Sequence, residues 1–358
     1  MNLDSLGWDA SWDAGFAPFA AQGLEPARVV TEDKHHYTVV GRQGPVLAQV
    51  AGKFFRQRNN PSTLPKVGDW VALRPNPASD RIAIEALLPR RSLITRKNPG
   101  RAGAPQILAT NIDVALVVQA LDATLSPRRI ERFLVSVHEG GARPVVILNK
   151  SDLHPDPESV LAEVQALAGN HPVVLTSART GRGLPLIRKH LPPSATAVFL
   201  GTSGVGKSSL VNRLLGEKAM VTLPVREWDS KGRHATTHRE LVLLPDGGLV
   251  IDTPGLREWH LWLADGGLDE AFPDIAGIAA GCRFRDCSHA AQPGCAVQQH
   301  AAEGLLAQER LASFLKLQAE LQAVAQRKQE HQWAQNRRRA RGGNHGVQRA
   351  RFADDDRP

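Results

Sequence analysis

An apolar stretch ending at Leu200 runs directly into Gly201-Thr202-Ser203-Gly204-Val205-Gly206-Lys207-Ser208, and a helical pattern follows from Ser209. A loop of this kind between a strand and a helix is typical of proteins that bind nucleoside triphosphates. The glycines let backbone N–H groups surround the phosphates, Lys207 reaches the β- and γ-phosphate oxygens, and the Ser208 hydroxyl is a ligand for Mg²⁺. The sequence therefore predicts an α/β domain with a phosphate-binding loop over residues 201–209.

A second motif, Asp252-Thr253-Pro254-Gly255, follows the apolar run Leu249–Ile251. A carboxylate at the end of a strand is suited to the Mg²⁺ shell, and the N–H of Gly255 is suited to contact a γ-phosphate. We therefore assign Asp252 and Gly255 to the same site. We also expect contact with the γ-phosphate at Gly255 to reorient residues 265–326, because this segment follows directly.

Two further motifs indicate which base is bound. Asn149-Lys150-Ser151-Asp152 follows the apolar run 145–148, and Thr176-Ser177-Ala178 follows the run 173–175. The Asp152 carboxylate would accept hydrogen bonds from the ring N–H and the exocyclic amine of guanine, a donor pair that adenine lacks. The backbone amides of residues 176–178 would donate to the guanine carbonyl. These motifs predict GTP as the nucleotide and disfavour an ATP-using kinase or transport ATPase.

The region before this domain has a different texture. Residues 28–97 contain short β-rich runs separated by Gly, Pro and Asn turns, which predicts a small β-barrel of the oligonucleotide-binding (OB) type. Its aromatic candidates for stacking on bases are Tyr37, Phe54 and Phe55. A generic barrel with a solvated basic face is the alternative.

The N-terminal extension, residues 1–27, carries one aromatic stripe. Trp8, Trp12, Phe16 and Phe19 recur at helical spacing, and we expect this helix to dock on the next domain.

The net charge of +8 is unevenly distributed. Residues 28–97 carry +8 and residues 327–351 carry +7, whereas the long centre, 98–326, carries −1. Two basic segments flanking a neutral centre suggest a polyanionic partner. In the basic tail, 327–358, the run Arg337–Arg341 is either an RNA contact or a set of cations near a helix C-terminus.

All three cysteines lie in one short cluster, Cys282-x4-Cys287-x-His289-x5-Cys295. Three thiolates and one imidazole are the ligands of a closed, structural Zn²⁺ site. Cysteines used in this way indicate a reducing, cytoplasmic setting. No apolar run is long enough to span a membrane, and the acidic N-terminus does not read as a signal peptide.

The order of the nucleotide motifs is circularly permuted, because the base-binding motifs precede the phosphate loop. In this order the chain resembles the ribosome small subunit-dependent GTPase A (RsgA/YjeQ) family. Lys66–Val71, Leu88–Ser92 and Gly232–Thr237 are also similar to that family's patterns. The resemblance implies an N-terminal OB-type β-barrel (28–97), a circularly permuted α/β P-loop GTPase domain (98–264) and an α-helical zinc-binding domain (265–326).

Leu256 stands where Ras-like enzymes place a glutamine that orients the attacking water. Another group must do this work, and His234 is our candidate, as the resemblance also implies. Thr236 would join Ser208 and Asp252 around Mg²⁺. Intrinsic hydrolysis should be slow, with a partner ordering the switch.

For function, the resemblance implies GTP hydrolysis coupled to late maturation of the small ribosomal subunit. The chain would act as a monomer, bind the subunit and its rRNA, and release assembly factors. The alternative is an RNA-binding or chaperone module whose affinity is gated by GTP.

Overall fold

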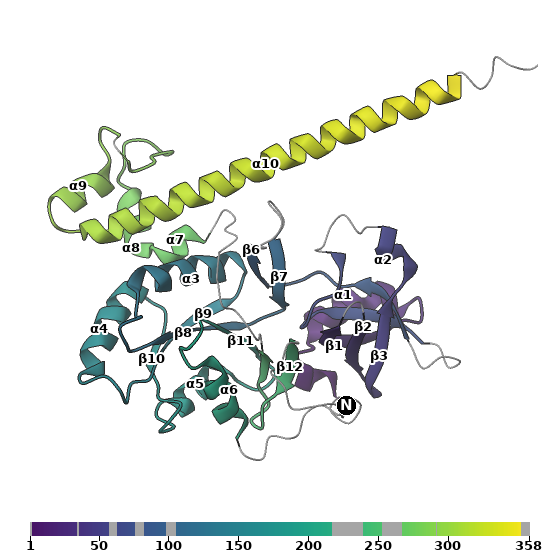
Figure 1. Ribbon diagram of the computed structural model, residues 1–358, viewed down its shortest axis with the longest axis horizontal. Coiled ribbons are helices and arrows are strands. Elements are labelled where there is room, and N and C mark those ends of the chain that lie inside the picture. Colours follow the sequence, from purple (N-terminus) through teal and green to yellow (C-terminus); the bar gives the residue numbers. More distant parts are fainter. Residues whose placement is uncertain are drawn as a thin grey trace, which may run out of the picture.

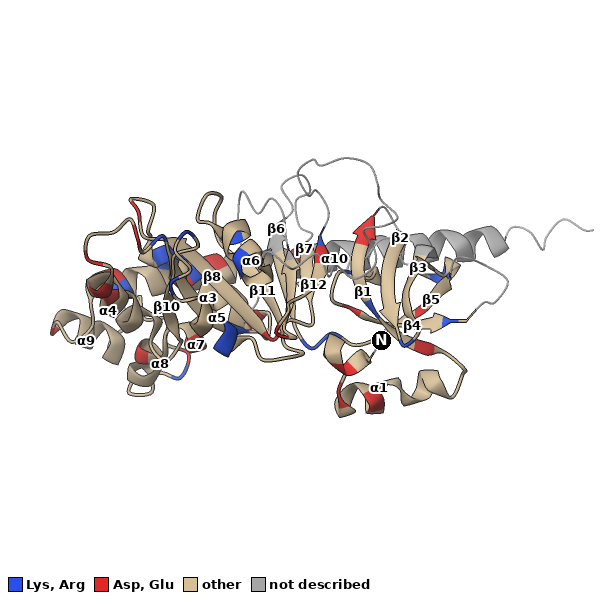
Figure 2. Ribbon diagram, turned by 90° about the horizontal axis from the view of Figure 1, so that it is seen from below, with Lys and Arg blue, Asp and Glu red and all other residues tan. Residues whose placement is uncertain are grey.

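The chain folds into a barrel, a helix-covered sheet and a C-terminal helical module (Figure 1). The computed structural model describes residues 2–33, 36–56, 63–75, 82–97, 105–216, 239–252, 267–290 and 292–351. Seen from below, the barrel and the helix-covered sheet lie side by side along the long axis (Figure 2).

The barrel closes through five strands. They are β1 (Glu25–Asp33), β2 (His36–Gly41), β3 (Gly44–Val50), β4 (Trp70–Arg74) and β5 (Ile82–Leu87), and α2 (Gly52–Arg56) follows β3. β1 pairs with both β2 and β4, and β3 pairs in parallel with β5, so the ring has no free edge. Val29, Val39 and Ile84 fill the interior. The predicted small barrel is confirmed.

Two of the three predicted base-stacking residues are instead part of this interior. Tyr37 is 1% exposed and Phe54 is 8% exposed. Alternation along β2 turns Tyr37 to the same side as Val39, which is the core side. The prediction that Tyr37 and Phe54 stack on bases is therefore wrong. The side chain of Phe55 lies outside the described residues.

Several basic residues of the barrel region are engaged within the protein. The ion pairs are Lys53 and Arg74 with Glu85, Lys66 with Glu32, and Arg90 with Asp69. The positive charge of residues 28–97 is thus partly neutralised where the structure describes it.

The N-terminal extension docks as predicted. Its helices are η1 (Leu3–Leu6) and α1 (Ala10–Ala20). Trp8, Trp12 and Phe16 are buried, and the ring centroids of Trp8 and Trp12 lie 4.7 and 6.1 Å from that of Trp70 in β4. The aromatic stripe joins the extension to the barrel.

The central sheet has the order β10-β9-β8-β11-β13-β12. Its strands are β8 (Val114–Ala120), β9 (Arg143–Asn149), β10 (Val173–Leu175), β11 (Thr196–Leu200), β12 (Glu240–Leu243) and β13 (Leu249–Asp252). All run parallel except β12. β11, which leads into the phosphate loop, lies at the centre between β8 and β13.

Helices cover both faces of this sheet. They are α3 (Pro127–Glu139), α4 (Pro157–Ala168), α5 (Leu184–His190) and α6 (Lys207–Leu215). Ala115 and Val117 of β8 face a core that includes α3, whereas Leu116 and Val118 face a core that includes α5 and α6. Strands buried on both faces explain the continuous apolar runs in the sequence.

Two connections join the barrel to the central sheet. β12 pairs with β1 at Thr31 and Glu240, so the two sheets are continuous. The second connection is the chain itself, which passes from β5 of the barrel through β6 (Leu93–Lys97) and β7 (Pro105–Thr110) to β8 of the central sheet. β6 and β7 pair with each other in a two-stranded sheet. Residues 93–97 therefore lie in this hairpin and not in the ring of barrel strands.

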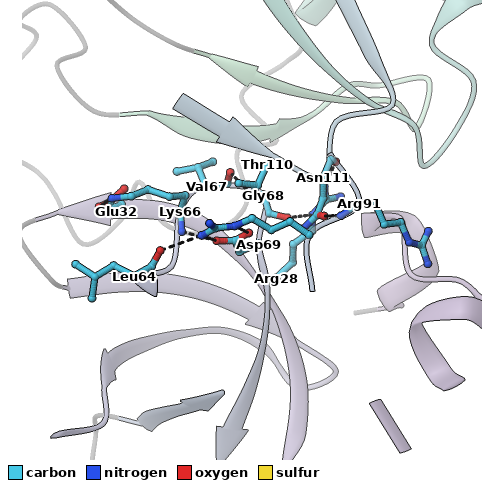
Figure 3. Close-up of polar contacts among 11 residues, drawn as sticks. Arg28, Glu32, Leu64, Lys66, Val67, Gly68, Asp69, Arg91, Thr110 and Asn111 are labelled. Carbon is cyan, nitrogen blue, oxygen red and sulfur yellow. Dashed lines mark hydrogen bonds and ion pairs between the residues drawn. The ribbon is translucent and has the colours of Figure 1, made fainter. Parts of the chain in front are cut away.

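A buried arginine organises the junction (Figure 3). Arg28 donates from Nε to the Gly68 carbonyl at 3.2 Å and from Nη2 to the Asn111 carbonyl at 3.0 Å. Asn111 Nδ2 donates to the same Gly68 carbonyl at 3.1 Å. Gly68 has φ +96°, and a Cβ there would stand 2.2 Å from the Thr110 carbonyl oxygen. The close approach of barrel and central domain thus requires glycine at position 68.

The C-terminal module packs on α3 and α4. Its helices are α7 (Leu268–Ala271), α8 (Pro273–Ala279), α9 (Ala296–Ala302) and α10 (Gln308–Arg351). Phe272 and Phe314 of the module share one apolar core with Ile130 and Leu134 of α3. Arg310 adds a buried ion pair, with Nη1 at 2.7 Å from Glu131 Oε1 on α3.

The helix α10 has 44 residues and is about 66 Å long, at about 1.5 Å per residue. Figure 1 shows it starting beside α7 and α8 and projecting away from the rest of the molecule. Among the side chains of α10 that the structure describes, the last buried apolar one is Leu321. It continues through Gly342 and Gly343, so the arginine run 337–341 does not mark a helix C-terminus. In the described part of the chain, each helix is too short or too polar to cross a membrane.

Two histidines meet where α3 ends. His138 Nε2 lies 3.1 Å from His171 Nε2. Burial is the main reason that the pKa of His138 is lowered to about 4, and the nearby His171 lowers it further, whereas Glu270 raises it. Between pH 6.5 and 4 the unfolded chain therefore binds a proton that the folded chain does not, so acid destabilises the fold.

We expect the urea concentration at the unfolding midpoint to be lower at pH 5 than at pH 7.5, and this decrease to be smaller in His138→Gln. A His154→Gln variant, changed in the loop after β9, should follow the unmodified protein; an identical decrease in all three proteins would contradict this assignment.

Candidate nucleotide and metal sites

The phosphate loop lies at the carboxyl end of the central strand β11. Gly201, Gly204 and Gly206 have φ values of +149°, +84° and +95°. A Cβ at Gly201 would stand 2.3 Å from the Val118 carbonyl oxygen, and one at Gly206 would stand 2.3 Å from Asn149 Nδ2. The loop can therefore lie against β8 and β9 only with glycine at these two positions.

The loop presents its polar groups outward. Ser203, Gly204, Ser208 and Ser209 are exposed, whereas Val205 is buried and anchors the loop. Lys207 begins α6, and its Nζ donates to the carbonyls of Gly201 and Thr202 at 2.7 and 2.8 Å. This places the ammonium directly over the loop, next to the N-terminus of α6, where anions are favoured.

Asn149 joins the base-binding loop to the phosphate loop. Its Nδ2 donates to the Val205 carbonyl at 2.8 Å. Its Oδ1 accepts from Ala178 N at 3.1 Å and from Thr176 Oγ1 at 3.2 Å. Asn149 is 1% exposed, so in this structure it connects the two loops and does not project into solvent.

Asp152 is held in place as an acceptor. Ser177 Oγ donates to Asp152 Oδ1 at 2.6 Å, and this bond holds the pKa of Asp152 below its ordinary value. Beside it, Lys150 has φ +64° and places Nζ 3.0 Å from Asp122 Oδ2. The Thr124 hydroxyl and the Lys150 ammonium lower the pKa of Asp122 to about 2. Because Ser177 donates to it and its pKa is lowered, the carboxylate of Asp152 remains ionised and oriented at neutral pH.

The backbone amides of residues 176–178 are not freely available to a base. Thr176 N donates to the Leu148 carbonyl, Ser177 N to the Arg182 carbonyl, and Ala178 N to Asn149 Oδ1. The structure therefore does not match the expectation that these three amides serve the guanine carbonyl. They hold the loop itself, because a turn after a strand must satisfy its own donors.

Asp252 ends β13, which runs parallel to β11. Ile251 lies opposite Val198, so the end of β13 lies at the same edge of the sheet as the phosphate loop. The role of Asp252 as a Mg²⁺ ligand stays a prediction. Gly255, His234 and Thr236 lie outside the described residues, as does the rest of the Gly232–Thr237 motif.

The cluster Cys282, Cys287, His289 and Cys295 is brought together. Their ligand atoms all lie within 4.8 Å of one another. His289 Nδ1 is 3.6 Å from Cys282 Sγ and 3.5 Å from Cys295 Sγ. Three sulfurs and one ring nitrogen converging in this way fit a tetrahedral Zn²⁺ ion with no position left for water. A metal held here would fix the loop 282–295 against α9 and α10.

One contact between α6 and the loop after β10 could not be predicted from the sequence. Arg213 of α6 reaches the loop after β10 and donates to its carbonyls. The partners lie 34 and 35 residues away, and a single arginine on a helix face carries no pattern that would reveal them.

Comparisons with known proteins agree with this geometry. The profile described as RsgA GTPase matches residues 87–262. A protein of Opitutus terrae named "Small ribosomal subunit biogenesis GTPase RsgA" is 46% identical over 337 residues, covering 92% of each chain. A protein of Syntrophotalea carbinolica with the same name is 42% identical, covering 95% of each chain.

Solved structures are similar as well. YjeQ from Thermotoga maritima aligns with a TM-score of 0.62 and 27% identity, over 83% of this chain and 98% of that one. YloQ, described as a circularly permuted GTPase, aligns with a TM-score of 0.59 and 26% identity, over 84% of this chain and 96% of that one. With the phosphate loop following the base-binding motifs along one parallel sheet, the chain belongs to the RsgA family of circularly permuted GTPases.

Proposed function

We propose that the protein hydrolyses GTP during maturation of the small ribosomal subunit, that it binds the subunit and its rRNA, and that hydrolysis releases assembly factors. The observation that carries this proposal is the 46% identity over 92% of the chain with a protein named for small ribosomal subunit biogenesis. The joined phosphate and base loops support the nucleotide chemistry. The protein would act as a monomer in the cytoplasm, where ribosomes are assembled.

Each site residue has a distinct task in this proposal. The amides of residues 201–206 and the Lys207 ammonium bind the phosphates, and Asp152 selects guanine. Ser208, Asp252 and Thr236 would hold Mg²⁺, which supplies positive charge to the phosphate oxygens. His234 would orient the attacking water, since Leu256 has no polar group. Gly255 would contact the γ-phosphate.

The C-terminal region supplies two further parts of the proposal. Zn²⁺ bound by the Cys3His cluster would be structural, because four protein ligands leave no position for substrate. The basic tail, 327–358, would contact RNA, as its charge and the projection of α10 from the rest of the protein suggest. Binding through such contacts should weaken steeply with salt.

Asp152→Asn tests the assignment of the base site. Guanine presents two donors to the carboxylate, and an amide can accept only one of them while its NH₂ opposes the other. We expect GTP affinity to fall by about 100-fold and xanthosine triphosphate, which carries a carbonyl in place of the amine, to bind better than GTP. Titration with fluorescent nucleotides measures both affinities.

The matched control is Asp246→Asn, in the turn between β12 and β13, where Asp246 pairs with Arg188. It should leave both affinities unchanged. If Asp152→Asn retained its preference for GTP, Asp152 would not be the residue that reads the base.

A further inference from the structure

Arg213 in the last turn of α6 holds the loop after β10 by two hydrogen bonds. Its Nε donates to the Ala178 carbonyl at 2.9 Å, and its Nη2 donates to the Arg179 carbonyl at 2.7 Å. Both bonds are assisted by the charge of the guanidinium, and its planar fork fixes their direction. The helix that follows the phosphate loop is thus tied to the loop that carries Ser177 and Ala178.

The first of these bonds sets the orientation of one peptide plane. The Ala178 carbonyl and the Arg179 N–H belong to the same peptide unit, and the described chain has no cis peptide bonds. In a trans unit the C=O and N–H point in opposite directions. Since Arg213 holds the carbonyl toward α6, the Arg179 N–H points away from α6.

This N–H is the first available donor in the loop. The three preceding amides are engaged within the protein, whereas the Arg179 N–H has no acceptor among the described residues. Residue 179 also lies beside the base-reading carboxylate, with Arg179 Nε 3.1 Å from Asp152 Oδ2. The carbonyl of guanine is adjacent to its ring N–H, so a donor for that carbonyl must lie next to Asp152.

We infer that Arg213 is a positioning residue for base recognition: it orients the Ala178–Arg179 peptide so that the Arg179 N–H donates to the 6-carbonyl of guanine. The inference rests on the proposed function, because it takes Asp152 as the residue that reads the base. Arg213 would thus link α6 to the base, in addition to the link that Asn149 makes between the phosphate loop and the loop after β10.

The test is a cycle of two proteins and two nucleotides. Dissociation constants are measured by calorimetry for the unmodified protein and Arg213→Ala, each with GDP and with 2-aminopurine riboside diphosphate. The analogue keeps the 2-amino group but lacks the 6-carbonyl and, with it, the ring N–H, so it offers Asp152 one donor and the effect of the substitution is read against its own affinity for the unmodified protein. We expect Arg213→Ala to weaken GDP about tenfold and the analogue less than about twofold, because only GDP uses the oriented N–H.

A merely structural role of Arg213 would weaken both nucleotides by the same factor, and that result would overturn the inference, as would no change for either. Arg213→Lys keeps the charge but lacks the planar fork that fixes the direction of the two hydrogen bonds, so its GDP affinity should be intermediate. This variant also serves if Arg213→Ala does not fold. The control Arg182→Ala removes an arginine of the same loop that pairs with Glu158 at 2.6 Å, and it should match the unmodified protein.

The outcomes separate this inference from the proposed function. If the unmodified protein binds GDP no better than ADP, the assigned base site fails, and the inference fails with it. If it prefers GDP but Arg213→Ala affects GDP and the analogue equally, the inference alone fails.

Discussion

Cys295→Ser should abolish Zn²⁺ binding at the proposed Cys3His site and unfold the C-terminal module. Cys295 is buried, its Sγ lies 3.5 Å from His289 Nδ1 and 3.9 Å from Cys282 Sγ, and its neighbours Val297 and Phe314 belong to the core shared with α3. Structural zinc sites in small peptides contribute about 10–16 kcal/mol of apparent binding free energy, which is comparable to the whole net stability of a folded domain, about 5–15 kcal/mol. Without the free energy of metal binding, the module should therefore be unfolded.

Two measurements follow the effect. Elemental analysis should give one Zn²⁺ per unmodified chain and none in Cys295→Ser, and hydrogen exchange should show loss of protection over residues 267–321. A chelator should give the same result. The control is His300→Gln, because His300 Nδ1 contacts the Ala296 carbonyl at 2.9 Å and lies outside the metal cluster. Full protection in metal-free Cys295→Ser would show that the module folds without the ion.

Asp69→Asn should destabilise the barrel and its attachment to the central domain by about 3 kcal/mol, the size expected when one partner of a buried ion pair is removed. Asp69 is 0% exposed and accepts from Arg90 Nε at 2.8 Å and Arg90 Nη2 at 2.7 Å. It also accepts from the backbone N–H of Lys66 at 2.7 Å. Figure 3 shows Asp69 beside Lys66, and Arg90 Nη2 also donates to the Leu64 carbonyl at 3.0 Å.

Denaturant unfolding followed by tryptophan fluorescence measures this change, because Trp70 follows Asp69 directly and packs against Trp8. The matched control is Glu158→Gln, which breaks an exposed pair with Arg182 and should cost less than about 0.5 kcal/mol. If the two variants were equally stable, the Asp69–Arg90 pair would contribute no more than a surface pair.

Local pattern predicted much of this fold. The helix Pro127–Glu139 shows how such patterns act, because Ser126-Pro127 is a start signal directly before it and Gly140-Gly141 is a stop signal directly after it. The strands before the nucleotide motifs were also predicted, since apolar runs of this length leave few alternatives. The convergence of the Cys3His cluster was predicted from the residue types and their spacing.

What could not be predicted depends on contacts between distant parts of the chain. Glu131 and Arg310 are 179 residues apart, and Arg28 and Asn111 are 83 apart. The inward direction of Tyr37 required the register of β2 in the barrel. Likewise, only the folded loop shows that the amides of residues 176–178 are already engaged.

The expected reorientation of the C-terminal module meets a specific barrier in this structure. The module and α3 share an apolar core, and Glu131, with 3% of its side chain exposed, accepts from Arg310, with 13% exposed. A movement relative to α3 would have to separate this pair. A rearrangement that carries α3 and the module together would preserve it.

The most direct test of the proposed function is GTP turnover with purified small ribosomal subunits, compared with free small-subunit rRNA and with no addition. The account predicts slow intrinsic turnover and acceleration by subunits of about 10³-fold or more, with little acceleration by free rRNA. Lys207→Ala, which removes the ammonium over the phosphate loop, should show no turnover in any of the three conditions. Equal acceleration by free rRNA would favour the GTP-gated RNA-binding alternative. Turnover that subunits and rRNA both leave unchanged would contradict the proposed function.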